Sequence, residues 1–425
     1  MVWGNSAFAG LVVAGFLLAG LLLRGRYPHI PIWSIMMAAM FLSLLTGLVG
    51  VDEAVGFVDF DVVFFLVGMF ALVGLAESSG LLNYIAVTAL SYFGNTVSMV
   101  VGSSLVFGLM AAFFLNDTVA LMGPAIAVLV GKAIGNKYEA SFMLLLHAIT
   151  VGSVMTPVGN PQNLMIAIQS GMQAPFIAFL AKLAVPTVIS LVVLGLYIVK
   201  VYGVEKRPVT AVALPAEAIV SRKDAYIAAL GISVSAGAIL VNDAFAALGL
   251  PHVSSRGLIP FIVAAAVWPF VSSPRDVLSR VDLGTILFFV AMFVTMEGVW
   301  RSGLLQMVLS HAGSVGFNGF GGILLTMTAS LGFSQILSNV PFTKLFIQYM
   351  RENGVTGADE NLWLSLATYS TIAGSLTILG AASNIIVLEV LERRYQLTIS
   401  FWRFMKIGVP VVAFTSVIYL PFLLL

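Results

Sequence analysis

The chain has 425 residues, of which 60% are hydrophobic and 9% are charged, with a formal net charge of +1 and a mean hydropathy of +1.05. Soluble globular proteins carry about 25% charged residues, so the composition excludes that class, and the charge gives no sign of a nucleic-acid partner. The absence of cysteine excludes disulfides and thiolate metal sites. Apolar runs of membrane-spanning length recur along the chain, so we expect an all-α polytopic protein embedded in the lipid bilayer of a cell membrane, and not a β-barrel.

The first apolar run, residues 7–23, is predicted to be a permanent span. A signal peptide would have basic residues before its apolar run, whereas here Arg24 and Arg26 follow it. Because cytoplasmic loops carry an excess of Lys and Arg, this order places the N-terminus outside the cell.

Several segments match others further along the chain at a constant spacing. Asp59 and Asp282 each open a long apolar run, and Ser79 and Ser302 each begin the letters SGLL. Both pairs are 223 residues apart (282 − 59 = 223 and 302 − 79 = 223). A constant offset over this length indicates an internal duplication.

A charged segment with two prolines separates the copies. We therefore predict a first transmembrane repeat over residues 1–202, a cytoplasmic linker over 203–224 and a second repeat over 225–425. If the Lys and Arg clusters of the chain all face the cytoplasm, the first repeat crosses an odd number of times, the second repeat is inverted, and both termini lie outside. Inverted repeats are typical of secondary transporters, which bind their substrate near the membrane midplane.

Polar letters interrupt the apolar pattern at matching places in the two copies. TPVGNPQN (156–163) corresponds to TILGAASN (377–384), since 377 − 156 = 221. Backbone at membrane depth leaves the helix only where protein or a water-filled cavity satisfies it, so each copy is predicted to contain a discontinuous helix with backbone hinges at Gly159, Pro161 and Gly380. The solute ligands predicted from these segments are Thr156, Asn160, Gln162, Asn163, Thr377, Ser383 and Asn384. The alternative is a kinked helix whose polar groups pack internally.

A second matched pair precedes the interruptions. FFLNDTVALMGP (113–124) and QILSNVPFTKLF (335–346) each place a polar pair inside an apolar stretch, which predicts a re-entrant hairpin with the polar pair at its tip. The letters pair Asn116 with Ser338 and Asp117 with Asn339 (339 − 117 = 222). We add Asn116, Ser338 and Asn339 to the predicted solute ligands, and expect the two tips and the two interruptions to meet at one place.

Asp117 is predicted to carry the coupling proton. A carboxylate at membrane depth is costly unless it is paired, hydrated or protonated, and it usually faces a transport pathway. The alternative is a capping residue that only accepts hydrogen bonds from backbone amides. The sequence shows no metal-ligand cluster and no nucleotide-binding fingerprint, so we expect no cofactor and no catalytic site, with H⁺ as the coupling ion and Na⁺ as the alternative.

Together, NDTVAL (116–121), SNVP (338–341) and the two interruptions make the chain resemble the ion transporter superfamily. This group includes arsenite/antimonite permeases, Na⁺/H⁺ antiporters and divalent anion symporters. The Asn-Asp of the first tip and the Asn-x-Pro of the second are most similar to the arsenite permease branch. Dicarboxylate symporters have Ser-Asn-Thr at both tips, a motif that Asp117 and Val340 would interrupt here.

The resemblance implies two inverted repeats, each with a re-entrant hairpin and a discontinuous helix, and proton-coupled efflux of a small inorganic solute, arsenite or antimonite. It also implies a homodimer, and a soluble ATPase or metallochaperone, as candidate partners. The alternative function is a sodium- or proton-coupled symporter of a small anion such as a dicarboxylate, sulfate or another oxyanion, which half-helix N-termini favour. A passive channel fits paired hairpins and broken helices less well, and no enzyme site can be assembled from the sequence.

Overall fold

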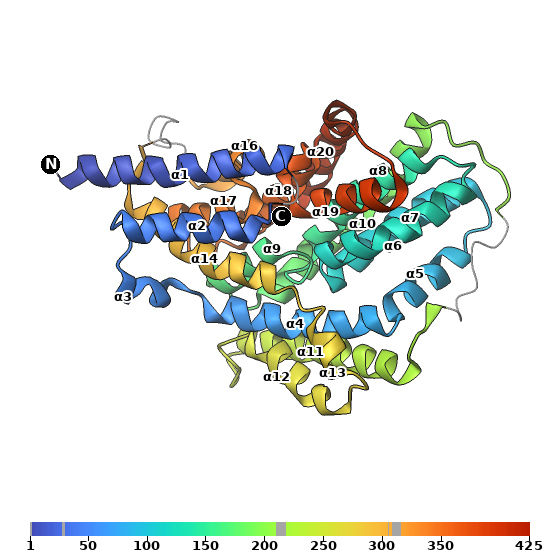
Figure 1. The fold of residues 1–425 in the computed structure, drawn as a ribbon, viewed down its shortest axis with the longest axis horizontal. Helices are drawn as coiled ribbons and strands as arrows, with labels where there is room; N and C mark the ends of the chain where they lie inside the picture. Colours follow the sequence, from blue (N-terminus) through green and yellow to red (C-terminus); the bar gives the residue numbers. More distant parts are fainter. Residues whose placement is uncertain (1, 28–29, 210–217, 305, 308–315) are drawn as a thin grey trace.

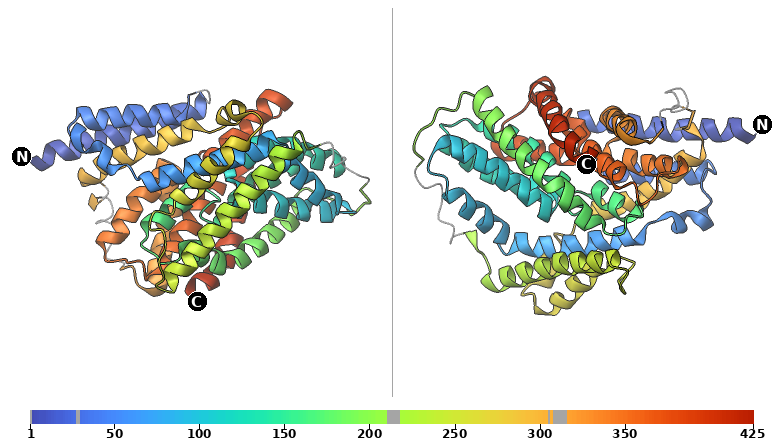
Figure 2. Two further views of the ribbon diagram at one scale, coloured as in Figure 1. Left: turned by 90° about the horizontal axis from the view of Figure 1, so that it is seen from below. Right: turned by 180° about the vertical axis from the view of Figure 1, so that it is seen from behind.

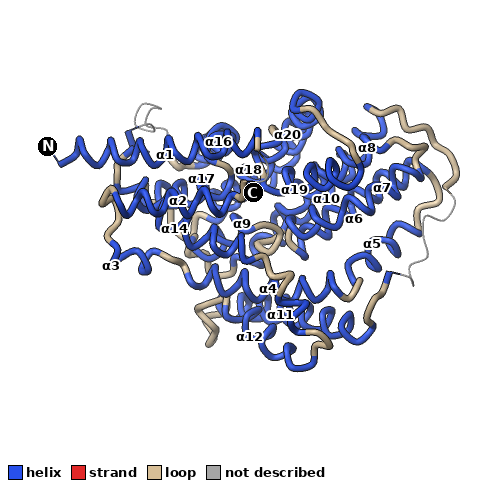
Figure 3. The backbone as a smooth tube through the Cα atoms, in the orientation of Figure 1, coloured by secondary structure: helices blue, strands red, loops and turns tan. Residues whose placement is uncertain are grey.

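A computed structural model describes residues 2–27, 30–209, 218–304, 306–307 and 316–425. Every regular element in these ranges is a helix (Figure 3), which confirms the all-α prediction. Nine of the described helices are long and apolar enough to span a membrane. Residues 210–217 of the predicted linker lie outside the described residues.

The two halves repeat the same order of elements. The first half contains α1 (Val2–Arg26), α2 (Ile32–Leu45), α3 (Val51–Ala54), α4 (Phe60–Ser78), α5 (Leu81–Ser91), α6 (Thr96–Phe114), α7 (Asn116–Ala133), α8 (Tyr138–Gly152), α9 (Pro161–Gln169) and α10 (Pro175–Val201). The second contains α11 (Arg222–Ala247), α12 (Leu258–Val267), α13 (Pro274–Leu278), α14 (Leu283–Arg301), α16 (Gly319–Leu337), α17 (Asn339–Glu352), α18 (Glu360–Ile372), α19 (Ala382–Val390) and α20 (Phe401–Leu424). The hairpin α6–α7 corresponds to α16–α17, and the pair α8–α9 corresponds to α18–α19.

Helices from both halves mix in space to form two bodies. In the scaffold body, α14 packs on α2, and α11 and α12 pack on α4. In the core body, α6 packs on α8 and α10, α16 on α18, and α10 on α20. Figures 1 and 2 place the hairpins α6–α7 and α16–α17 on opposite sides of the centre of the molecule. The predicted division at residues 203–224 therefore describes the sequence repeat, whereas each body takes helices from both sides of it.

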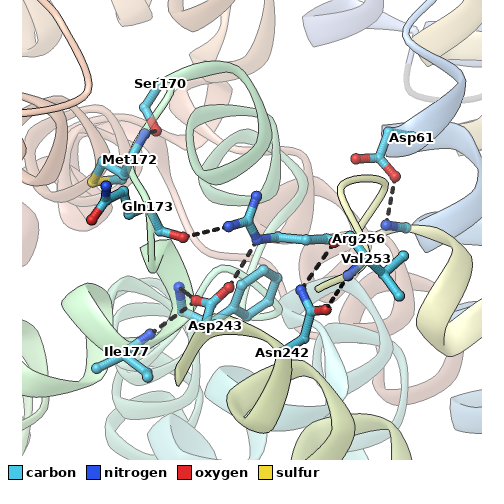
Figure 4. A network of polar contacts seen from close by, with 11 residues as sticks. Asp61, Ser170, Met172, Gln173, Ile177, Asn242, Asp243, Val253 and Arg256 are labelled. Carbon is cyan, nitrogen blue, oxygen red and sulfur yellow. Dashed lines mark hydrogen bonds and ion pairs between the residues drawn. The ribbon is translucent and has the colours of Figure 1, made fainter. Parts of the chain in front are cut away.

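A buried ion pair connects the scaffold body to the core body (Figure 4). Asp243, at the end of α11, is fully buried and pairs with Arg256 at 2.8 Å. Its second oxygen accepts the backbone amides of Phe176 and Ile177 at 2.7 and 3.4 Å, so it caps the positive end of α10. Arg256 also donates to the carbonyl of Gln173 at 2.5 Å. These contacts hold the start of a first-half core helix against a second-half scaffold helix.

Candidate solute-binding site

Each hairpin turns at a single residue with an unusual backbone conformation. Leu115 joins α6 to α7 with φ 66° and ψ 133°, and Ser338 joins α16 to α17 with φ 68° and ψ 158°. Residues with a side chain rarely adopt a positive φ of this kind, and holding one there costs on the order of 1–3 kcal/mol. The surrounding helices therefore impose the same strained turn at both tips.

The turns correct the predicted pairing of the two tips. Ser338 lies 223 residues after Leu115 (338 − 115 = 223), so Ser338 corresponds to Leu115 and not to Asn116. It follows that Asn116 corresponds to Asn339, and Asp117 to Val340. The prediction was displaced by one residue because it matched polar letters, whereas the turn residue of the first tip is an apolar Leu. The first tip therefore carries a carboxylate where the second carries a branched alkyl group.

The interruptions break both helices at the predicted places. Thr156 has φ −136° and ψ 156°, and Thr377 has φ −136° and ψ 157°, so the chain becomes extended in the same way in both copies. At Gly159 an added Cβ would lie 2.3 Å from the carbonyl oxygen of Ser153, so no larger residue fits there. Pro161 then starts α9 at a position where a missing amide proton costs little.

The predicted ligands Asn160 and Asn163 hold the first break together. The Asn160 side chain donates to the Ser153 carbonyl at 3.3 Å and to Thr371 Oγ1 at 3.2 Å, and that of Asn163 donates to the Ser153 carbonyl at 3.1 Å. Thr371, on α18 of the other half, in turn donates to Asn163 Oδ1 at 3.1 Å. Thr156 donates to the Ala112 carbonyl. These side chains are buried behind the cavity described below and do not line it.

The second break has a different set of contacts. Thr377 donates to Gln335 Oε1 at 2.7 Å, and Gln335 donates to the carbonyl of Ala373 at 2.9 Å. Asn384 donates to the Gly374 carbonyl at 2.7 Å, whereas its Oδ1 is buried without a hydrogen-bond partner in the described part of the chain. The hinge Gly380 and the predicted ligands Thr377, Ser383 and Asn384 also lie outside the cavity lining.

A cavity of about 70 Å³ lies where the two tips meet the two breaks. The tips and breaks line it with Asn116, Asp117, Ser338, Asn339, Val340, Pro161, Gln162, Ala381 and Ala382. The scaffold body closes it with Ile32, Thr285, Phe288 and Phe289. Six predicted site residues are thus brought together from both halves. No polar interruption in the sequence marks Thr285, which is why it was missed.

Helix N-termini and amide oxygens set the electrostatics of the cavity. Helices α7, α9, α17 and α19 all begin at it, and the N-terminus of a helix carries a partial positive charge. The Oδ1 atoms of Asn116 and Asn339 are buried and have no hydrogen-bond partner among the described residues. Of the lining residues, Asp117 alone is charged. Its carboxylate makes no hydrogen bond within the described chain, so it is not the backbone cap of the alternative interpretation.

Comparison with known proteins identifies the family. A family model described as a citrate transporter matches residues 13–358 of the chain. The chain belongs to the citrate transporter family. An uncharacterized transporter of Mycobacterium tuberculosis is 27% identical over 84% of this chain and 83% of its own length. The silicon efflux transporter LSI3 of Oryza sativa is 23% identical over 89% of this chain and 90% of its own.

A solved structure supports the fold. The YdaH transporter of Alcanivorax borkumensis is similar with a TM-score of 0.56 and 17% identity, over 88% of each chain. Family and fold together make this chain a multi-pass membrane transporter. The superfamily resemblance holds at this level, while the comparisons give no support to the arsenite permease branch.

Proposed function

We propose that the protein exports a small uncharged oxyacid, of the arsenous or silicic acid kind, in exchange for protons. The observation that carries this proposal is the cavity of about 70 Å³, in which the side chains offer unpartnered amide oxygens and one carboxylate. A cavity of this volume suits a solute of a few heavy atoms.

Hydroxyl groups fit the hydrogen-bonding chemistry of this cavity. The amide oxygens of Asn116 and Asn339 and the carboxylate of Asp117 accept hydrogen bonds, and an uncharged hydroxide of arsenic, antimony or silicon donates them. Each such group also has oxygen lone pairs, which the backbone amides at the start of α9 and α19 can bind. Arsenite and antimonite, which are mostly uncharged near neutral pH, remain the substrates that the tip motifs favour.

Proton exchange follows from the position of Asp117. When Asp117 is ionised, its carboxylate accepts a hydrogen bond from a hydroxyl group of the solute. When Asp117 is protonated, one of its oxygens becomes a donor, which no longer accepts from the solute and competes with it for the amide oxygens of the cavity. The solute is then released. A proton and the solute therefore bind alternately, which is the requirement for an antiporter in which inward proton movement drives solute out.

A small anion is the second candidate, because four described helix N-termini converge on the cavity and the family model is named for citrate. Citrate itself, a tricarboxylate, is larger than the cavity and would place its charges beside Asp117 without a cationic side chain in the lining. An anion would bind best after Asp117 is protonated, so the proton and the solute would move together.

The two candidates predict opposite effects of pH on binding. Purified protein in detergent is titrated with arsenite, silicic acid, succinate, sulfate and citrate at several pH values, and the ligand-induced rise in melting temperature is measured. An exported oxyacid should bind more tightly as Asp117 loses its proton, and an anion more tightly as it gains one. In everted vesicles, the first candidate also predicts arsenite or silicic acid accumulation when the lumen is acidic. Accumulation that ignores the proton gradient would contradict it.

A further inference from the structure

A second and larger cavity opens beside the end of α1. It measures about 220 Å³ and is lined by Arg24 of α1 and by Leu379, Ile385, Glu389, Glu392 and Thr398 among others, from the second break onward. We call it the inner vestibule, because Arg24 belongs to the basic cluster that the positive-inside rule assigns to the cytoplasm. It is separate from the central cavity and shares no lining residue with it.

A narrow space lies between the inner vestibule and the central cavity. This throat, of about 30 Å³, shares Arg24, Leu379 and Ile385 with the vestibule. It shares Ile32, Ser338 and Ala382 with the central cavity. The three spaces thus follow one another from the end of α1 to the solute site, and the throat is the smallest of them.

Arg24 lies where the vestibule meets the throat. Its Nε is buried and has no hydrogen-bond partner in the described chain. Glu389 and Asp117 are the acidic groups that act on it electrostatically, and Glu389 is already paired with Arg393 at 2.8 Å. A half-buried guanidinium whose Nε has no partner is suited to bind the oxygen atoms of an oxyacid or oxyanion.

Away from Arg24, two hydrogen bonds connect helices that begin at the central cavity, α9 and α17, to the start of α4 and to α14. Gln169 of α9 donates to Asp59 at 2.7 Å, and Gln348 of α17 donates to Glu297 of α14 at 2.8 Å. The connected spaces with an unpartnered donor thus lie on the Arg24 side.

We propose that Arg24 is an access site, where a solute from the cytoplasm binds before it passes Ser338 into the central cavity. The guanidinium selects solutes that carry oxygen acceptors and concentrates them at the throat. Only the identity of the solute rests on the proposed function. The route itself and the positive field of Arg24 can be tested without that solute.

The absence of cysteine makes the test direct. Ile385→Cys places a thiol in the lining shared by vestibule and throat, and Ser338→Cys places one in the lining shared by throat and central cavity. Each variant is treated with membrane-impermeant methanethiosulfonates, one carrying a sulfonate and one a trimethylammonium group, in everted and in right-side-out vesicles. The labelled fraction is measured over time by mass spectrometry.

We expect Ile385→Cys to react faster from the cytoplasmic side. Because Glu389 and Glu392 line the vestibule together with Arg24, the effect of the guanidinium is read from the ratio of the sulfonate rate to the trimethylammonium rate. Adding Arg24→Gln should lower the ratio of the two rates about tenfold, since one unit charge changes each rate about threefold in opposite directions. Adding Arg394→Gln, an exposed arginine of the same region that lines none of the three spaces, should leave the ratio unchanged.

Two results would overturn the access site. The first is labelling of Ile385→Cys from the outer side only, and the second is a rate ratio that Arg24→Gln does not alter. Transport then separates this proposal from the proposed function. Arg24→Gln should raise the KM for cytoplasmic solute several-fold with little change in kcat, whereas a shift of the pH profile alone would show that Arg24 acts only through Asp117. If the labelling results hold but no oxyacid is transported, the route stands and the proposed substrate class fails.

Discussion

The first and second broken helices have nearly the same backbone but very different support. The first break is buried except at Val158, which is partly exposed, and its polar side chains bond to one another and to Thr371 of the other half. At the second break, residues 376–379 are partly exposed, and Asn384 Oδ1 is without a partner in the described chain. Local opening costs least where buried contacts are fewest. The comparison therefore indicates that the first break, which lies beside Asp117, is rigid. The second break, which lies beside the throat, should open locally at a lower free-energy cost.

The largest effect is expected from removing the charge of Asp117, which the first hairpin tip carries and the second does not. Asp117→Asn keeps the size of the side chain and removes its titration, so proton-driven transport should fall to the background of protein-free vesicles. Binding should persist, within about tenfold, because the remaining acceptors of the cavity are intact. The measurement is the loss of the pH dependence of binding in the thermal-shift titration. Val340→Asp, the matched change at the second tip, should not restore coupling; proton-driven transport that survives in Asp117→Asn would refute the assigned role.

The next effect compares the support of the two breaks directly. Asn160→Ala removes hydrogen bonds to Ser153 and Thr371 and leaves their buried groups unsatisfied, so the free energy of unfolding should fall by about 2–4 kcal/mol. Asn384→Ala removes bonds to the carbonyls of Gly374 and Thr377, and should cost about 1 kcal/mol. Thermal unfolding in detergent measures both. Equal losses would show that the second break is as tightly held as the first.

How far the sequence predicts the site can be judged from these residues. Gly159 and Pro161 mark the first break because only particular residues tolerate its backbone, and such positions are visible in a sequence. The division of labour among the amides is not visible, because Asn160, which holds backbone, and Asn116, which faces the cavity, have the same chemistry. The register of the tips was missed for a related reason. Leu115 takes a positive φ without the Gly or Asn that usually marks one.

A smaller effect is expected at the contact between the halves. Thr371→Val keeps the shape of the side chain and removes a hydroxyl that bonds to Asn160, Gln162 and Asn163, so the free energy of unfolding should fall by about 1–3 kcal/mol. Thr150 is the repeat-related control (371 − 150 = 221). Among the described residues its hydroxyl bonds only to the carbonyl of Leu146 in its own helix, so Thr150→Val should cost about 0.5–1 kcal/mol. The idea that Thr371 joins the halves fails if the two variants unfold alike.

At the strained turns, one substitution is expected to raise the free energy of unfolding instead of lowering it. Ser338→Gly should relieve about 1–3 kcal/mol of backbone strain and cost about 0.5–1 kcal/mol of chain entropy, so the protein should gain about 1 kcal/mol of stability. Ser338→Ala removes the same hydroxyl but keeps the strain, and should give no gain. At the first tip, Leu115 is buried, so Leu115→Gly would lose about 1.5–3 kcal/mol of apolar burial and should not stabilise. Melting temperatures of the three variants decide whether strain is stored at the second tip.

The smallest effect concerns the closed end of the molecule, where Glu53 on α3 contacts Arg301 at the end of α14. The backbone amide of Gly50, which donates at 2.9 Å, and the Arg301 guanidinium at 2.7 Å lower the pKa of Glu53 below its ordinary 4.5. A lowered pKa in the folded state stabilises the protein above the unfolded pKa, and the contribution is lost as the pH falls through the folded value. Glu53→Gln should therefore lower the melting temperature slightly at neutral pH, and the difference from the wild type should vanish once the pH falls below the lowered pKa of Glu53 in the folded protein. Asp52→Asn, one residue earlier on α3, removes an exposed carboxylate without these contacts and provides the control. A deficit of Glu53→Gln that persists in acid would mean that the side chain acts through packing and not through its charge.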